Sequence, residues 1–172
     1  MVIPAITALA IRHFKHDTPE GELEPKHPAV RFVLAAWNDG DFSEAAEHVA
    51  PDLTIHMNGF AFEPDGDVDG PTMARQSIEY WRTIAPDIKM KLLREIRQKD
   101  DIAIEWLVTG THTGEIADLP ASGNPIELRG SAFLTLENDK VVDAATAFDA
   151  LALVVQTGAT EPPAWWPGRA SP

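Results

Sequence analysis

The hydrophobic and polar positions in the first half of the chain predict helices. Over residues 29–37 the apolar residues recur at the spacing of one helix face, and a polar Asn-Asp-Gly-Asp run follows. Ser43 can cap a second, shorter helix over residues 44–49. A third helix is expected over residues 72–84, because Pro71 stands where helices often begin.

The second half of the chain predicts strands. Residues 53–58 alternate between polar and apolar, and four further segments, 88–96, 102–112, 126–136 and 141–148, are joined by turns. Asp149 is expected to cap a closing helix over residues 150–156, which Gly158 ends. Helices followed by strands indicate an α+β fold with one curved antiparallel sheet.

The regular pattern covers residues 28–160, which we expect to form one domain. Residues 1–27 form a leader before it, and residues 161–172 form a tail rich in Pro and Trp. The leader holds His13, His16 and His27 near carboxylates, but their spacing matches no metal-ligand pattern, so no metal is expected. The two tryptophans of the tail are expected to anchor it on the domain or on a partner subunit.

Composition narrows the possible partners. The chain has 172 residues, of which 44% are hydrophobic, enough to enclose a core or a small cavity. Its formal net charge of -13 disfavours nucleic acid and anionic membranes. The sequence has no cysteine, which excludes thiol catalysis, disulfides and thiolate metal sites. Residues 2–11 are apolar but shorter than the ~20 residues that span a bilayer, so we expect a cytoplasmic protein.

Several short strings, in order, resemble a known family. They are WNDGD at 37–41, GTHTGE at 110–115, LPASG at 119–123, and RG at 129–130. Together they resemble the SnoaL-like polyketide cyclases, which have the nuclear transport factor 2-like fold. The resemblance implies a cone in which a bent sheet and about three helices enclose an apolar pocket. It also implies a homodimer paired through the outer face of the sheet.

The resemblance implies an activity as well. The best-known members close a ring of an aromatic polyketide by an intramolecular aldol reaction, without metal or cofactor. In these relatives an aspartate is the general base and a histidine assists. The corresponding positions here are Thr146 and Leu134. Leucine transfers no proton and threonine without a neighbouring base is a poor one, so the aldol mechanism cannot simply be carried over.

Two histidines are the remaining candidates for proton transfer. Alternation in residues 102–112 places Trp106 and His112 on one face, which we expect to point inward. On the first strand His56 shares a face with Thr54 and Asn58. Two neutral imidazoles beside an apolar cavity could serve as general acid and base near pH 7. Each could equally be a structural group.

Other residues are candidates for binding. The substrate-binding candidates are Trp37, Asn58, Tyr80, Trp81, Trp106, Leu134 and Thr146. The aromatic ones could instead be ordinary core. Glu105 and Arg129 are expected on the outer face, as an ion pair or a dimer contact.

Two functions from different classes therefore stay open. One is a cofactor-free enzyme that cyclises or isomerises a polyketide-like small molecule by proton transfer. The other is a protein that binds an apolar ligand in the same pocket without catalysis. An epoxide hydrolase is less favoured, because no Arg with two inward carboxylates stands on the corresponding strands. A ketosteroid isomerase mechanism is also disfavoured, since Tyr80 is the one tyrosine.

Overall fold

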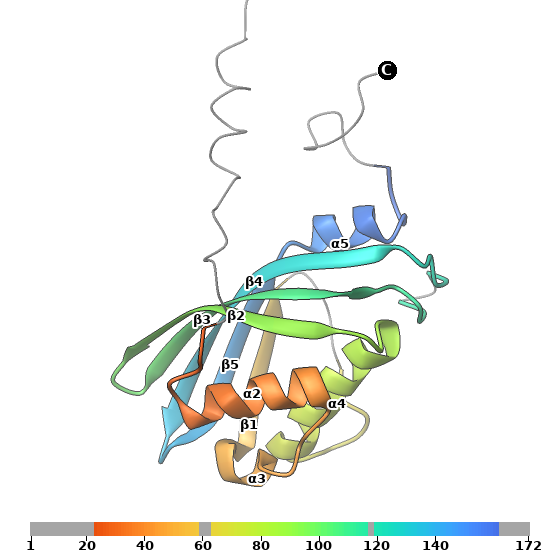
Figure 1. Ribbon diagram of the computed structural model, residues 1–172. Coiled ribbons are helices and arrows are strands. Elements are labelled where there is room, and N and C mark those ends of the chain that lie inside the picture. The colour runs from red at the N-terminus through yellow and green to blue at the C-terminus, as the bar shows by residue number, and fades with distance from the viewer. Residues whose placement is uncertain (1–22, 59–62, 117–118, 162–172) are drawn as a thin grey trace, which may run out of the picture.

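A five-stranded sheet bends over three helices in the computed structural model, which describes residues 23–58, 63–116 and 119–161 (Figure 1). The leader and the tail fall largely on residues 1–22 and 162–172, outside the described residues. None of the described helices is long and apolar enough to cross a membrane.

Of the three helices under the sheet, two come first along the chain and the third follows the first strand. Helix α2 (Pro28–Asp39) begins where the His27 ring nitrogen Nδ1 accepts the Ala29 N–H at 3.2 Å. It ends at Gly40, whose φ of 68° lies in the left-handed region that favours glycine. Helix α4 (Gly70–Ile84) is capped by Asp69, which accepts the Thr72 N–H at 3.0 Å.

The short helix and the first strand differ from the sequence prediction. The expected cap by Ser43 is absent: helix α3 (Ala45–His48) has Glu44 at its N-cap position and no side-chain cap. Strand β1 (Val49–Asn58) begins four residues earlier than expected, since Val49 already pairs with Val141 before an irregularity in the register. The expected cap at Asp149 is confirmed: it accepts the Ala152 N–H at 2.9 Å at the start of α5 (Ala150–Gln156).

The strand order is β1-β5-β4-β3-β2. The four later strands are β2 (Lys89–Gln98), β3 (Asp101–Thr111), β4 (Pro125–Glu137) and β5 (Lys140–Phe148). They pair in antiparallel fashion, as expected. Strand β1 departs from the expected antiparallel sheet because it runs parallel to β5 at the edge.

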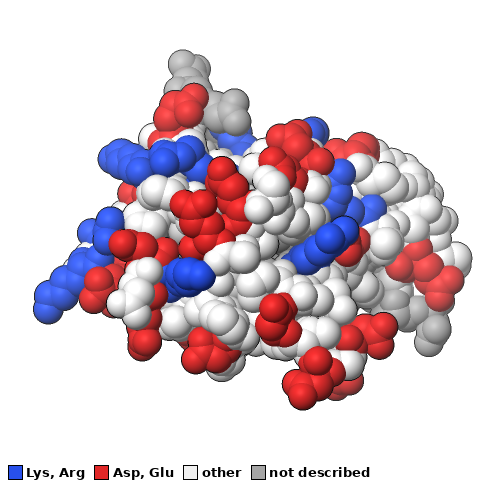
Figure 2. All heavy atoms as spheres, turned by 90° about the horizontal axis from the view of Figure 1, so that it is seen from below, with Lys and Arg blue, Asp and Glu red and all other residues white. Residues whose placement is uncertain are grey.

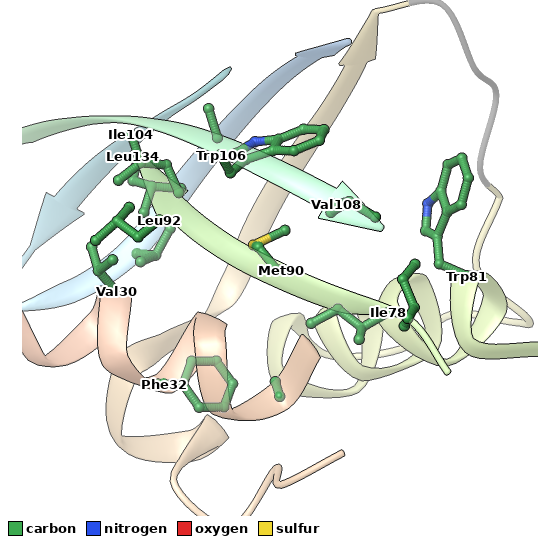
Figure 3. Close-up of a cluster of buried hydrophobic side chains, with 14 of the residues drawn as sticks. Val30, Phe32, Ile78, Trp81, Met90, Leu92, Ile104, Trp106, Val108 and Leu134 are labelled. Atoms are coloured by element: carbon green, nitrogen blue, oxygen red, sulfur yellow. The ribbon is translucent and has the colours of Figure 1, made fainter. Parts of the chain in front are cut away.

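The core lies between the sheet and helices α2 and α4 (Figure 3). Ile104, Trp106 and Val108 point inward from β3, which confirms the expected orientation of this strand. The indole of Trp106 lies over Gly130 of β4, its register partner, and a Cβ at position 130 would overlap the ring. Glycine at this position therefore gives Trp106 the room to cross its neighbouring strand.

Charge is spread over the surface. Figure 2 shows the face below the helices, where acidic side chains are scattered and the basic ones form no continuous patch. The described residues of that face therefore form no basic surface of the kind that binds nucleic acid.

Candidate functional site

A cavity of about 130 Å³ lies between the sheet and helices α2 and α4. All five strands and both helices contribute to its wall. The side chains from β1 and β5 include Leu53, Ile55, Met57, Val141, Ala144 and Thr146. Because its wall here is mostly aliphatic, we call this cavity the aliphatic lobe.

A smaller hollow of about 30 Å³ adjoins the aliphatic lobe. Trp37, Met57, Trp106 and Thr146 line both spaces, which makes them two lobes of one site. The smaller space also touches the side chains Trp81, Val108, Leu128 and Phe148, and we call it the aromatic lobe. Figure 3 shows Trp106 between Ile104 and Leu134 on one side and Trp81 on the other.

The two lobes hold very few polar groups. Within the described residues, no Asp, Glu, His, Lys, Arg or Tyr lines either lobe. The hydroxyls of Ser77 and Thr146 are the polar side-chain groups of the wall besides the indole nitrogens. Neither hydroxyl makes a hydrogen bond within the described part of the chain, so both can bond a ligand. The site can therefore surround a neutral apolar molecule and form hydrogen bonds with one or two of its oxygens.

Two side chains outside the wall hold it in place. The Asn38 amide donates to the Met90 carbonyl at 3.0 Å and accepts the Met90 N–H at 2.7 Å, which ties the end of α2 to the edge strand β2. Arg82 of α4 donates to the Trp37 carbonyl at 2.7 Å. The Asn38 bonds hold the end of α2 against Met90, and the Arg82 bond holds the wall residue Trp37 against α4.

Five of the expected binding residues lie at the site. Trp37, Trp106, Leu134 and Thr146 line the aliphatic lobe, and Trp81 lines the aromatic lobe. Leu134 and Thr146 point into the cavity from adjacent strands, since the strand register pairs Leu134 with Ala144, and Ala132 with Thr146.

His56 and Asn58 lie on the opposite face of the sheet, which corrects their expected position. Leu53, Ile55 and Met57 occupy the cavity face of β1, so the alternating residues face outward. The His56 Nε2 atom lies 2.9 Å from Asp143 Oδ2, with the two side chains 57% and 40% exposed. His56 therefore has no access to a molecule in the cavity.

His112 is fully buried but lines neither lobe. Its Nδ1 atom accepts the Ser122 N–H at 3.3 Å and lies 2.9 Å from Ser122 Oγ. This bonding places the proton of the neutral ring on Nε2, which has no hydrogen-bond partner within the described residues. The two histidines are not brought together, so the expected acid–base pair does not form at the cavity.

Tyr80 also stands apart from the wall. It is partly buried against the core, and its ring meets Trp81 edge-on, with centroids 6.3 Å apart. Burial raises the pKa of its hydroxyl. It supports Trp81 rather than lining either lobe.

Sequence reasoning missed Met57, Met90 and Ser77 as wall residues. Met57 lies on the face of β1 opposite to His56. Choosing that face as the inward one would have predicted Met57 as a wall residue. Ser77 stands one helical turn before Trp81 on α4, and its helical spacing was the available signal. In the described part of the chain, no group of three or more His, Asp or Glu residues could hold a metal ion.

A bent sheet, mostly antiparallel, that closes an apolar cavity with helices is the nuclear transport factor 2-like fold. The model of one family with this fold, described as SnoaL-like polyketide cyclase, matches residues 27–157. The chain belongs to this family.

Solved structures agree on the fold. IdmH from Streptomyces antibioticus is 23% identical, with a TM-score of 0.63 over 76% of this chain and 96% of that chain. TsrD from Streptomyces laurentii is 22% identical, with a TM-score of 0.66 over 77% and 93%. A SnoaL-like polyketide cyclase from Agrobacterium tumefaciens is 17% identical, with a TM-score of 0.60 over 74% and 94%. A search of curated proteins found no match.

Proposed function

We propose that this protein binds a neutral, apolar, polyketide-like small molecule in the two-lobed cavity, and that no ionisable side chain moves a proton there. One observation supports this above the others: in the described residues, the wall of both lobes has no ionisable group. Burying a charge away from water is costly unless it is paired, so such a wall favours an uncharged ligand.

Membership of the family favours a second candidate, cyclisation or isomerisation of the bound molecule. Leu134 and Thr146 occupy the positions where the resemblance expects the catalytic pair, and neither is a general base near pH 7. Ring closure here would therefore depend on the acidity of the substrate and on hydroxyl groups such as Thr146.

Tryptophan fluorescence can test the binding function, because Trp37 and Trp106 line the cavity. We expect neutral aromatic ketones to change the emission saturably and to remain chemically unchanged after hours with the protein. Ala144→Phe should abolish the change by filling the aliphatic lobe. Ala147→Phe, on the outer face of the same strand, is the matched control and should bind as the parent does. Absence of any saturable change would contradict the proposal, and turnover would favour the second candidate.

We also infer that two copies pair through the outer face of the sheet. Ile96, Ala103, Phe133 and Ala145 follow one another across four strands on this face, by the strand register. Phe133 is 61% and Ile96 is 56% exposed. Arg129 and Glu105, 2.6 Å apart at their closest, lie on the same face and confirm the expected ion pair. An apolar row beside charged groups resembles the core and rim of a protein interface.

Light scattering after size-exclusion chromatography tests the pairing. The parent chain should elute with the mass of a dimer. Phe133→Asp should give the mass of a monomer, because it places a charge in the apolar row, whereas Glu137→Asp at the end of the same strand should not. A parent chain of monomer mass would contradict the inference.

A further inference from the structure

We propose that the ligand is a small neutral aromatic ketone or carbinol: one ring joined through an oxygen-bearing carbon to a short aliphatic chain. This inference rests on the proposed function and assigns each part of the ligand to a part of the site.

The size of the site limits the number of rings. The two lobes measure about 130 Å³ and about 30 Å³. An apolar cavity of about 150 Å³ in another protein holds benzene, whereas pockets for drug-sized ligands measure about 300–1,000 Å³. One ring with a short substituent fits this range, and a flat four-ring system does not.

The two lobes differ in chemistry, and this difference sets the orientation of the ligand. The aromatic lobe is bounded by three indoles and by Phe148, which meets Trp81 edge-on at 86° with centroids 5.6 Å apart. Aromatic rings favour such edge-to-face and offset contacts, so this lobe suits the ring of the ligand. The aliphatic lobe is bounded by branched side chains such as Leu53, Ile55 and Ile104, which suit an alkyl chain.

Thr146 lines both lobes and so marks their junction. Its hydroxyl has no hydrogen-bond partner within the described residues and can donate to a carbonyl or accept from an alcohol. The ligand oxygen is therefore placed on the carbon that joins the ring to the chain. No Lys or Arg of the described wall offers charge to a carboxylate, so an anionic relative of the same size is disfavoured.

Calorimetric titration of the full chain with four probes tests the assignment. The probes are butyrophenone, butylbenzene without the oxygen, 4-propylbenzoate with a charge, and tetracene-5,12-dione with four rings. We expect butyrophenone to bind most tightly and 4-propylbenzoate at least about tenfold more weakly. Binding of the dione alone, or of butylbenzene as tightly as butyrophenone, would overturn the inference while leaving apolar binding intact. Equal affinity for the benzoate would contradict both the inference and the neutral ligand of the proposed function. If none of the four binds, the proposed function itself fails.

Two variants test the orientation. Thr146→Val should weaken the binding of butyrophenone about two- to tenfold, the range for one hydrogen bond, and leave the binding of butylbenzene unchanged. Thr109→Val, on the outer face of β3, is the matched control and should change neither. Ala144→Leu should weaken the binding of butyrophenone more than that of acetophenone, because acetophenone lacks most of the alkyl chain that the aliphatic lobe holds. Equal effects of Thr146→Val on both probes, or of Ala144→Leu on both ketones, would contradict the orientation.

Discussion

At the scale of single residues, the wall of the cavity consists of side chains that cannot hold a charge. Leu134 and Thr146 face the lobes from adjacent strands, and the two histidines expected to carry acid–base chemistry, His56 and His112, point elsewhere. A protein that moves protons with its side chains needs a titratable group within hydrogen-bond reach of the substrate. Within the described residues, this wall has none.

A carboxylate at position 146 should be poorly tolerated for the same reason. We expect Thr146→Asp to lower the unfolding free energy by roughly 1–3 kcal/mol at pH 7.5, because the charge has no partner. Burial raises the pKa of such a carboxyl, so the loss should shrink as pH falls and the group is protonated. Urea unfolding at pH 7.5 and 5.5 measures both effects. Thr109→Asp is the exposed control, and an equal loss in both variants would contradict the account.

Gly130 offers a second test at this scale, because its missing side chain makes room for Trp106. Gly130→Ala should lower the unfolding free energy by about 1–3 kcal/mol, the usual range for overpacking. In a Trp106→Leu background the same change should be less costly, although the Ala147 carbonyl oxygen, 2.7 Å from the added Cβ, leaves part of the cost. Denaturation of the four chains of this double-mutant cycle gives the coupling, and a coupling near zero would rule out the steric explanation.

The sequence predicted the two faces of each strand better than it predicted which face points inward. Alternation placed Trp106 correctly because its strand is long and carries apolar residues at alternate positions, which are buried in the structure. On β1 the same alternation left His56 and Met57 as equal choices. Which of them points inward depends on the pairing of β1 with β5 and on which side of the sheet the helices cover. The local pattern of ten residues predicts neither feature.

At the scale of elements, helix ends and an edge strand hold the site. The sequence predicted most elements to within a few residues, because caps and turns are local signals. It did not predict the parallel pairing of β1, since that depends on how the chain returns through α4 and three further strands. Asn38 is another non-local feature: its bonds to Met90 replace the strand partner that edge strand β2 lacks.

Loss of the Asn38 amide should loosen the edge of the sheet beside the cavity. We expect Asn38→Ala to speed hydrogen exchange at the Met90 amide, which would lose its acceptor, and to weaken ligand binding at the wall. The control is Asp39→Ala, which keeps the Asn38 amide and removes only the exposed ion pair of Asp39 with Lys89 on strand β2, 3.5 Å long. This variant should leave Met90 protected. Unchanged protection of Met90 in Asn38→Ala would show that the amide does not hold this strand.

The cap of α2 makes stability depend on pH. Burial, with Arg97 nearby, lowers the pKa of His27 in the folded protein below its ordinary 6.5. The unfolded chain then binds a proton more readily, so the unfolding free energy should fall as pH drops below about 6.5. His27→Asn keeps a side-chain cap without a titrating ring. Urea unfolding between pH 8 and pH 5.5 should show a weaker pH dependence in this variant; an identical dependence would contradict the role of His27.

At the scale of the whole molecule, the sheet separates two surfaces of different composition. Its inner face and the helices enclose the apolar lobes, while its outer face carries the exposed row that includes Phe133 and the Arg129–Glu105 pair. The family strings in the sequence identified this architecture, because they mark the turns and close approaches that the fold requires. They could not identify the chemistry, which depends on the few side chains that line the cavity.

The affinity for butyrophenone as a function of pH tests most directly whether an ionisable group takes part at the cavity. Calorimetry between pH 6.5 and pH 8.5, in buffers of different ionisation enthalpy, should give a dissociation constant that changes less than about twofold. It should also show no proton taken up or released, since no titratable side chain of the described wall meets the ligand. A tenfold change in affinity across this range, or a measurable proton release, would contradict the account.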